Sequence, residues 1–369
     1  MGKKFLIIDD SALMRRVISD IIKENYDDVE ALDTAVNGLE GFDKLVSKPG
    51  YYDLVILDIN MPKMNGLELL EMLQKNRMNE TVVVVSTVAR ESAAETIRAL
   101  ELGAIDFLKK PENFYEVKSE GFKTKLLKLI EVVTGRYLNK KNLIPHKKNS
   151  APVIIPARNH VEAQPAGIIR SSNSKNHTRI VAIACSTGGP KSLQQVIPYL
   201  PENLDAGVVL VQHMPKGFTA SLAMRLNSLS EAVVKEAEDG EVIENGHVYI
   251  APGGMHIIIA QSGKNHVIRY SDQPPVDGLR PCANIMFESL SNTDYDDITC
   301  VVLTGMGADG TKGIQSLVDT GRRVHVIAQD AESCIVYGMP RAIAEAGLAN
   351  EIQPLNKISE SIIKNVGVM

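Results

Sequence analysis

Short apolar runs alternate with segments of helical periodicity along most of this 369-residue chain. In the first third, strand-like runs predict five strands, which are Phe5–Ile8, Val29–Ala35, Leu54–Leu57, Val82–Val85 and Ile105–Leu108. Between these runs, apolar residues recur at helical spacing, as at Leu13, Val17 and Ile21. Strands that alternate with helices predict a parallel sheet with helices on both faces.

The same alternation resumes after residue 177. Apolar runs predict strands at Ile180–Ala184, Val208–Val211, Ile298–Leu303 and Val324–Ala328, and helices include Thr219–Leu226 and Ala283–Leu290. Turn signals at Asp239-Gly240 and Asn245-Gly246 interrupt a β-rich middle section, which predicts a small antiparallel insert or edge. We therefore expect a second, doubly wound and mostly parallel α/β domain with a small antiparallel portion.

A basic stretch without regular patterning separates the two halves. Residues 136–176 contain eight Lys or Arg, four prolines and a single acid, Glu162. This composition is typical of a flexible, solvated linker, although its positive charge also suits contact with an acidic partner. The predicted boundaries are 1–130 for the first domain, 131–176 for a helix end and the linker, and 177–369 for the second domain.

Composition excludes several classes of protein. A net charge of −5 gives no reason to expect nucleic acid as a partner. Apolar runs stay well below the roughly 18 residues that span a membrane, so membrane insertion is not expected. The four cysteines are scattered without Cys-x-x-Cys pairing, which indicates reduced thiols in a cytoplasmic protein.

Charged residues follow the predicted strands of the first domain. Asp9 and Asp10 end the first strand, Asp58 ends the third and Lys110 ends the fifth. The carboxyl ends of parallel strands meet at one edge of the sheet, where three carboxylates repel one another unless a cation joins them. A hard cation with oxygen ligands, such as Mg²⁺, is expected at this edge.

These strand ends resemble the receiver domain of two-component response regulators, a flavodoxin-like five-stranded fold. The segments that carry the resemblance are Ile8-Asp9-Asp10-Ser11, Leu57-Asp58-Ile59-Asn60-Met61-Pro62-Lys63-Met64-Asn65-Gly66, Val85-Ser86 and Lys109-Lys110-Pro111. The resemblance implies that a histidine kinase phosphorylates Asp58. The Mg²⁺ ligands that it implies are Asp9, Asp10, Asp58 and the backbone carbonyl of Asn60.

The resemblance also implies a conformational switch. Ser86 would be the hydroxyl that moves toward the phosphoryl group, with Thr87 as the alternative, and Lys110 would be its charged partner. The Lys110–Pro111 bond is a candidate cis peptide.

A serine lies on a tight turn in the second domain, between a buried strand and a helix that Pro190 begins. The turn reads Ser186-Thr187-Gly188-Gly189-Pro190, and helical spacing continues as far as Leu200. A dinucleotide-binding loop would need Gly-x-Gly-x-x-Gly, which the turn does not supply. The other interpretation is a nucleophile turn related to Gly-x-Ser-x-Gly, with Ala184 at the first glycine position. Cys185 is the rival nucleophile, with a side chain expected to face the core.

A nucleophilic serine needs a base and an acid that orients the base. His213 directly follows the strand Val208–Val211 and Gln212, so it is expected at the same sheet edge as Ser186. Asp309 lies in a glycine-rich loop after another strand, and Asp330 is the rival acid. Packing or surface roles are expected for the histidines within the second domain's other apparent strands, which are His247, His256, His266 and His325.

This half of the chain resembles the CheB family of chemotaxis methylesterases. The matching segments are Ser186–Pro190, Gln212–Pro215, Gly217–Thr219, Val248–Gly254, Thr304–Gly310 and Asp330–Cys334. The resemblance implies hydrolysis of glutamate methyl esters on chemoreceptors, and often deamidation of receptor glutamines, without a cofactor. It implies Ser186 as nucleophile, His213 as base and Asp309 as orienting acid, with oxyanion donors near Thr187 and Met306.

A phosphorylatable domain joined to a hydrolase suggests regulation. We expect the unphosphorylated receiver to rest on the catalytic edge and to loosen when Asp58 is phosphorylated. The non-enzymatic alternative is a receiver coupled to a module that only binds receptors.

Overall fold

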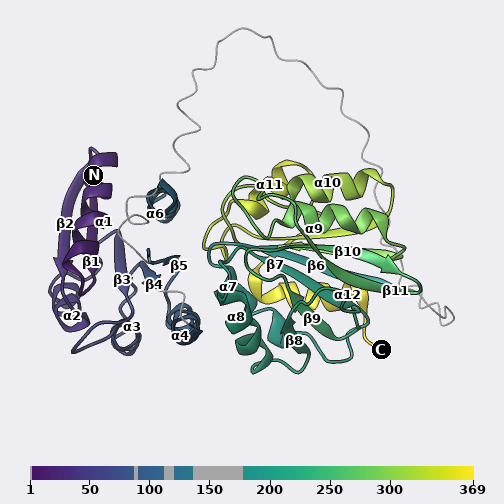
Figure 1. Ribbon diagram of the computed structural model, residues 1–369, viewed down its shortest axis with the longest axis horizontal. Coiled ribbons are helices and arrows are strands. Elements are labelled where there is room, and N and C mark those ends of the chain that lie inside the picture. Colours follow the sequence, from purple (N-terminus) through teal and green to yellow (C-terminus); the bar gives the residue numbers. More distant parts are fainter. Residues whose placement is uncertain (1, 87–89, 112–119, 136–177) are drawn as a thin grey trace, which may run out of the picture.

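The computed structural model describes residues 2–86, 90–111, 120–135 and 178–369, which form two α/β domains (Figure 1). Most of the predicted linker lies outside the described residues.

The first domain is a parallel sheet with strand order β2-β1-β3-β4-β5. Its strands are β1 (Lys3–Ile8), β2 (Val29–Ala35), β3 (Leu54–Asp58), β4 (Val82–Ser86) and β5 (Asp106–Lys109). Its helices are α1 (Ala12–Asn25), α2 (Gly38–Ser47), α3 (Gly66–Lys75), α4 (Arg90–Glu101) and α6 (Glu120–Val133). This strand order is that of flavodoxin-like sheets, in which the switch between β1 and β3 places a site at their carboxyl ends.

Alternate residues of the strands build two cores, one on each face of this sheet. Phe5 and Ile7 of β1 pack in the cluster that contains apolar residues of α1 and α6. Leu6 and Ile8 point the other way, into the cluster formed with α2, α3 and α4. The two-residue period of a strand therefore explains why the last four positions of β1, Phe5–Ile8, are all apolar.

The second domain contains a seven-stranded parallel sheet with order β14-β13-β12-β6-β7-β9-β8. Its strands are β6 (Arg179–Cys185), β7 (Gly207–Gln212), β8 (Val233–Glu236), β9 (His247–Ile250), β12 (Asp297–Val302), β13 (Arg323–Gln329) and β14 (Glu351–Gln353). A separate antiparallel hairpin consists of β10 (His256–Ser262) and β11 (Asn265–Ser271). The α-helices are α7 (Gly189–Leu193), α8 (Phe218–Asn227), α9 (Ala283–Ser289), α10 (Thr311–Asp319), α11 (Met339–Glu345) and α12 (Ile358–Val366).

The helices cover both faces of this sheet. Residues of α9, α10, α11 and the hairpin pack on one face, and those of α7, α8 and α12 pack on the other, as Figure 1 shows. From the central strand β6 the chain moves outward through β7 on one side and later returns to β12 on the other. The carboxyl ends of β6 and β12 therefore flank the switch point, which is where open α/β sheets bind their ligands.

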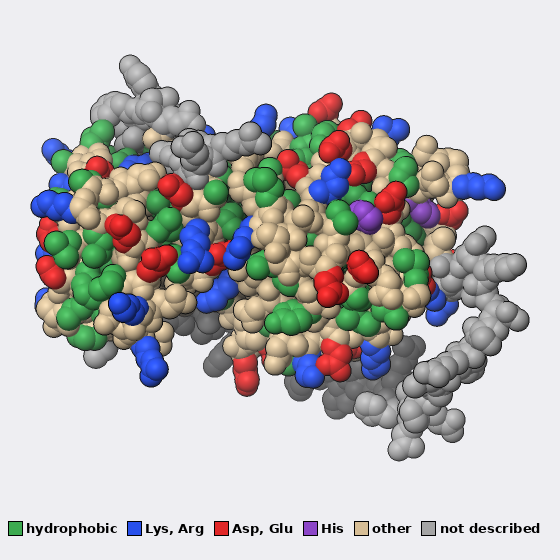
Figure 2. All heavy atoms as spheres, turned by 90° about the horizontal axis from the view of Figure 1, so that it is seen from below, with side chains coloured by type: hydrophobic (Ala, Val, Ile, Leu, Met, Phe, Trp, Pro, Cys, Tyr) green, Lys and Arg blue, Asp and Glu red, His purple; other side chains and the backbone are tan. Residues whose placement is uncertain are grey.

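The receiver packs against this same edge of the second domain. The Phe107 ring of β5 lies 4.5 Å from the Phe218 ring of α8, measured between centroids. Glu101, at the end of α4, forms an ion pair with Arg225 of α8. Figure 2 shows basic side chains gathered along the seam between the two domains. The interface thus combines an aromatic contact with charge pairing.

The structure confirms the predicted strands in both domains, with ends that differ by one or two residues. The helix predicted from Pro190 to Leu200 is wrong, because α7 ends at Leu193 and a short 3₁₀ turn, Ile197–Tyr199, follows. Pro198 lacks the N–H that a continuing helix would use.

The antiparallel portion is an insert rather than a sheet edge. The predicted cis bond before Pro111 is also wrong, since among the described residues the cis bond precedes Pro281.

Candidate active site

Three segments that are distant in sequence meet at the carboxyl edge of the second sheet. Ser186 follows β6, His213 follows β7 and Asp309 lies in the loop after β12. Backbone hydrogen bonds align the first two strand ends, since the His213 N–H donates to the Cys185 carbonyl at 3.2 Å. The Ser186 N–H donates to the Thr304 carbonyl at 3.0 Å, which fixes the β12 loop beside the serine.

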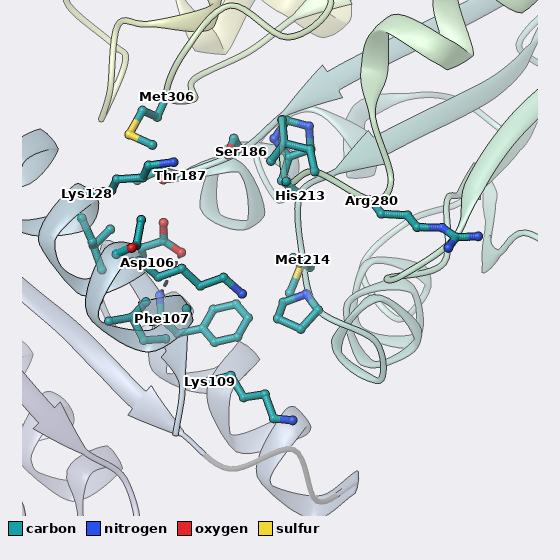
Figure 3. Close-up of a pocket in the computed structure, with 18 of the residues that line it drawn as sticks. Asp106, Phe107, Lys109, Lys128, Ser186, Thr187, His213, Met214, Arg280 and Met306 are labelled. Carbon is teal, nitrogen blue, oxygen red and sulfur yellow. Dashed lines mark hydrogen bonds between the residues drawn. The ribbon is translucent and has the colours of Figure 1, made fainter. Parts of the chain in front are cut away.

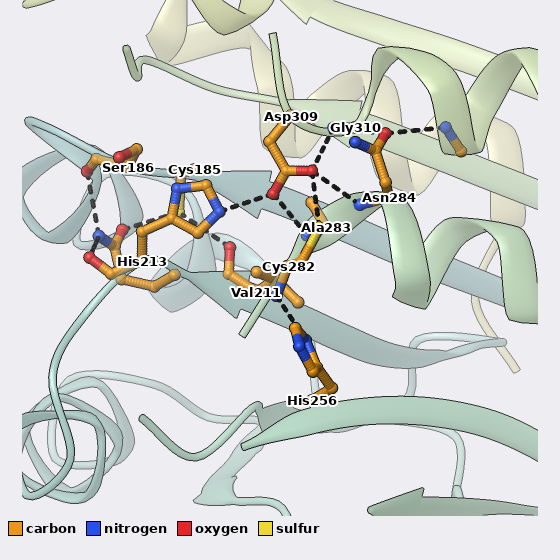
Figure 4. Close-up of polar contacts among 12 residues, drawn as sticks. Cys185, Ser186, Val211, His213, His256, Cys282, Ala283, Asn284, Asp309 and Gly310 are labelled. Atoms are coloured by element: carbon orange, nitrogen blue, oxygen red, sulfur yellow. Dashed lines mark hydrogen bonds and ion pairs between the residues drawn. The ribbon is translucent and has the colours of Figure 1, made fainter. Parts of the chain in front are cut away.

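His213 and Asp309 form a close pair. The distance between His213 Nε2 and Asp309 Oδ2 is 2.8 Å, and the two side chains are 8% and 5% exposed. The ring lies between Asp309 and Ser186 (Figure 4), so Nδ1 is the nitrogen left for the serine. Asp330, the rival acid, accepts hydrogen bonds from Ser333 instead, at 3.0 Å from its N–H and 2.5 Å from its hydroxyl.

The Asp309 carboxylate is buried but well supplied with donors. Besides His213, it accepts hydrogen bonds from Ala283 N at 2.6 Å, Asn284 N at 2.9 Å and Gly310 N at 3.0 Å. Burial alone would raise the pKa of Asp309, but the hydrogen bond and charge of His213, with these N–H groups, lower it to about 2. Asp309 is therefore ionised at neutral pH, as an acid that orients a histidine must be.

Ser186 and His213 line one cavity of about 590 Å³ between the two domains (Figure 3). Thr187 and Met306, the predicted oxyanion residues, line it too. The turn after Ser186 is tight, because Gly188 has a φ of 77° and the Gly189 N–H donates to the Ser186 carbonyl at 2.7 Å. The predicted nucleophile, base and oxyanion residues thus face the same space.

Cys185 does not face this cavity. Its side chain is fully buried, and its thiol donates a hydrogen bond to Gln212 Oε1 at 3.0 Å. Burial raises the pKa of this thiol far above its usual value, so the thiolate is scarce at neutral pH. These observations favour Ser186 as the nucleophile.

Gln212 is a supporting residue that sequence reasoning missed. Its amide nitrogen donates to the Ser186 carbonyl at 3.0 Å, while its amide oxygen accepts from Cys185. A Cβ on Gly189 would lie only 1.9 Å from that oxygen, so this glycine is required for the turn to pack on Gln212. The sequence offered one indication of this role, which is that Gln212 directly precedes the predicted base His213.

The carboxylates predicted for the receiver also meet. One oxygen from each of Asp9, Asp10 and Asp58 lies within 4.8 Å of the others. Lys110 Nζ lies 2.8 Å from Asp58 Oδ2 and 3.0 Å from Asp9 Oδ2. Asn60 lies two residues after Asp58, in the loop that follows β3.

Their electrostatics fit a bound cation. Burial and the neighbouring Asp9 charge raise the pKa of Asp58 to about 6, even though Lys110 opposes the shift. Burial also raises the pKa of Asp9. One lysine therefore leaves these carboxylates short of positive charge, and a divalent cation with oxygen ligands would relieve the repulsion.

The predicted switch hydroxyl is buried beside this cluster. Ser86 is 1% exposed, and its hydroxyl accepts a hydrogen bond from the Thr96 hydroxyl at 2.7 Å. Thr87, the alternative, lies outside the described residues.

Together these features define a class of protein: a receiver joined to an α/β serine hydrolase. The family model described as CheB methylesterase matches residues 181–362, and that described as response regulator receiver domain matches residues 5–120. The chain is 41% identical over 370 residues to a protein-glutamate methylesterase/protein-glutamine glutaminase of Geobacillus kaustophilus, covering 99% of each chain. It is 40% identical over 366 residues to the protein of that name in Bacillus subtilis, covering 97% of each.

Among solved structures, the chain is similar to the CheB methylesterase catalytic domain of Thermotoga maritima, with 44% identity and a TM-score of 0.49. That similarity covers 51% of this chain and 98% of the other. The chain belongs to the CheB family of receiver-containing protein-glutamate methylesterases. None of the helices in the described part of the chain is both long and apolar enough to cross a membrane.

We predict that Gly305→Ala displaces the serine. A Cβ at this position would lie 2.8 Å from Ser186 Cβ and 3.0 Å from Ser186 N, closer than packed atoms approach. A shift of about 1 Å in a nucleophile costs on the order of 100-fold in rate, so kcat for ester hydrolysis should fall by about that factor. The thermal unfolding midpoint of the same variant serves as the control for folding. A kcat equal to that of the wild type would contradict the geometry described for this turn.

Proposed function

We propose that this chain hydrolyses glutamate methyl esters on the cytoplasmic helices of chemoreceptors, and deamidates receptor glutamines, under the control of receiver phosphorylation. The observation that carries the proposal is the His213–Asp309 pair, 2.8 Å apart, with His213 lining the same cavity as Ser186. Its relatives are named protein-glutamate methylesterase/protein-glutamine glutaminase, and such a site can perform this hydrolysis.

The first half of the reaction is an attack by Ser186 Oγ on the γ-carbonyl carbon of the glutamyl ester. His213 accepts the serine proton, and the ionised Asp309 stabilises the imidazolium that results. The oxyanion forms toward backbone N–H groups near Thr187 and Met306. Removing one such donor costs roughly 3–4 kcal/mol of transition-state stabilisation.

The second half releases the products. His213 donates its proton to the leaving methoxide, so methanol departs and an acyl-serine remains. A water that gives its proton to His213 then attacks the acyl carbon, which frees the glutamate and the serine. With a glutamine substrate the same steps release ammonia in place of methanol.

The receiver would take its phosphoryl group from a histidine kinase at Asp58. Asp9, Asp10 and Asp58, with the backbone carbonyl of Asn60, would hold Mg²⁺, which would neutralise the carboxylates and the incoming phosphoryl oxygens. Lys110 would contact the phosphoryl group and Ser86 would act as the switch hydroxyl. The protein would then act in the cytoplasm, together with its kinase and the receptor helices.

We further propose that the docked receiver limits access to Ser186. The contacts of strand β5 support this proposal. Asp106 and Phe107 of this short strand contact the catalytic domain, and Lys110, directly after the strand, contacts Asp58. Asp106 forms a hydrogen bond with the Thr187 side chain, yet burial raises the pKa of Asp106 to about 6. Burying the Asp106 carboxyl away from water costs free energy and so opposes docking of the receiver. Such a cost is consistent with a receiver that must leave the catalytic domain when it is phosphorylated.

We predict that Ser186→Ala abolishes methanol release from methylated receptor, whereas Cys185→Ala retains most of it. The alanine at 186 removes the nucleophile, and the thiol at 185 is buried away from the cavity. Methanol and ammonia should be measured in parallel, so that esterase and deamidase activities are compared on one preparation. An active Ser186→Ala protein would rule out the mechanism. Receptor binding without methanol or ammonia release by the wild type would favour the non-enzymatic alternative.

We predict that Arg225→Glu raises the activity of the unphosphorylated chain. The new charge would face Glu101 across the interface, and a cost of about 1 kcal/mol would shift the docking equilibrium about fivefold. Methanol release without a phosphodonor measures the effect.

The matched control is the double variant Glu101→Arg/Arg225→Glu, which restores opposite charges. It should return basal activity toward the wild-type level. Unchanged basal activity in Arg225→Glu would argue against a blocking receiver.

A further inference from the structure

His256 is a fully buried histidine on the far side of Asp309 from His213. It begins β10, and its place in the sequence predicts only a packing or surface role. In the structure both ring nitrogens have polar partners (Figure 4 draws the one from Cys282). The Cys282 N–H donates to Nδ1 at 3.1 Å, and Nε2 lies 3.3 Å from the Pro274 carbonyl oxygen.

These partners define the protonation state of the ring. A backbone N–H can only donate, so Nδ1 must be an unprotonated acceptor. A carbonyl oxygen can only accept, so Nε2 carries the hydrogen. His256 is therefore neutral, with its proton on Nε2. Protonating Nδ1 would bring two N–H groups together and break the bond to Cys282.

Cys282 links this histidine to the catalytic acid. Its thiol, in a residue that is 1% exposed, donates to Asp309 Oδ1 at 3.1 Å. The next two residues, Ala283 and Asn284, donate their backbone N–H groups to the same carboxylate. Three successive residues thus hold Asp309, and His256 fixes the backbone N–H of the first of them.

A second contact fixes the other end of this support. The Asn284 side-chain oxygen accepts hydrogen bonds from Gly310 N at 3.0 Å and Gly313 N at 2.8 Å. The loop that carries Asp309 is therefore tied to the start of α9. His256, at the start of the hairpin, holds this support at Cys282.

We propose that His256 is a positioning residue for the esterase reaction, acting through Cys282–Asn284 to set the orientation of Asp309 and hence of His213. This inference rests on the proposed function, because it assigns His256 to the same site. The positioning depends on His256 Nδ1, which accepts the hydrogen bond from the Cys282 N–H.

Neighbouring groups favour the neutral ring. Burial lowers the pKa of His256, and the nearby Arg280 charge lowers it further, whereas the Pro274 carbonyl and the Asp309 charge act in the opposite direction. The net result is a pKa below the usual value, so the ring keeps its acceptor at neutral pH.

Two substitutions separate the nitrogens of His256. In His256→Asn the amide oxygen stands near the place of Nδ1 and keeps an acceptor for Cys282 N–H. In His256→Gln the amide nitrogen stands near the place of Nε2 and keeps the donor to Pro274, but the Nδ1 acceptor is lost. Each variant removes one hydrogen bond of the same ring, so a purely structural role would affect both alike.

The experiment measures kcat and KM for methanol release from methylated receptor by the full chain, with thermal midpoints for each variant. His256→Asn should keep kcat within about threefold, while His256→Gln should lose on the order of 10- to 100-fold in kcat with little change in KM. Equal effects of the two variants on kcat, large or small, would overturn the inference. An inactive wild type would instead refute the proposed function.

If either variant fails to fold, Cys282 tests the next step of the proposal, which is the contact between residue 282 and Asp309. Cys282→Ser keeps a donor to Asp309 and should retain kcat, whereas Cys282→Ala removes it and should lower kcat at similar KM. A second readout is the NMR signal of the His213 ring proton shared with Asp309, which should move in His256→Gln or Cys282→Ala. Equal kcat in the serine and alanine variants, with no movement of that signal, would show that residue 282 does not position the acid.

Discussion

The catalytic edge depends on keeping one buried carboxylate ionised. Removing a charge from water costs several kcal/mol unless hydrogen bonds replace its hydration. Asp309 receives these bonds from His213, Cys282, Ala283, Asn284 and Gly310. The donors come from β7, α9 and its own loop, so the charge can be buried only when these elements are correctly packed. The same bonds set the direction in which Asp309 presents an oxygen to His213.

The position of the receiver follows from the same edge. Both sheets carry their chemistry at the carboxyl ends of strands, and β5 lies close to both sets of residues. Phe107 packs on Phe218, while Lys110 bridges Asp58 and Asp9. A charge added at Asp58 would compete for Lys110 and so act on the strand that touches the hydrolase. The phosphorylation site and the catalytic edge could therefore be coupled through the few residues of β5.

Much of this architecture could be predicted from the sequence. Buried parallel strands appear as short apolar runs, so β1, β3, β4, β6, β7, β12 and β13 could be located by pattern. Because polar residues that follow such runs must meet at one edge, Asp58, His213 and Ser186 stood out. Asp309 was favoured over Asp330 by its glycine-rich loop, and the contacts of the two acids agree with that choice.

The supporting contacts could not be predicted in the same way. Ala283 and Asn284 reach Asp309 across more than 20 residues of sequence, through backbone N–H groups that every residue type except proline carries. His256 looked like any histidine at the start of a strand, because only its partners reveal its tautomer. Contacts between the domains, such as Phe107 with Phe218, depend on tertiary packing that leaves no periodic signal.

The most direct test of the account is covalent trapping of the full chain with a serine-reactive phosphonate, followed by mass spectrometry of the labelled peptide. The account predicts a single adduct on Ser186, formed at a rate that falls on the order of 10³- to 10⁴-fold in Asp309→Asn, because the histidine loses the partner that fixes its tautomer. An adduct on another residue, or labelling of Ser186 at the same rate in both proteins, would contradict it.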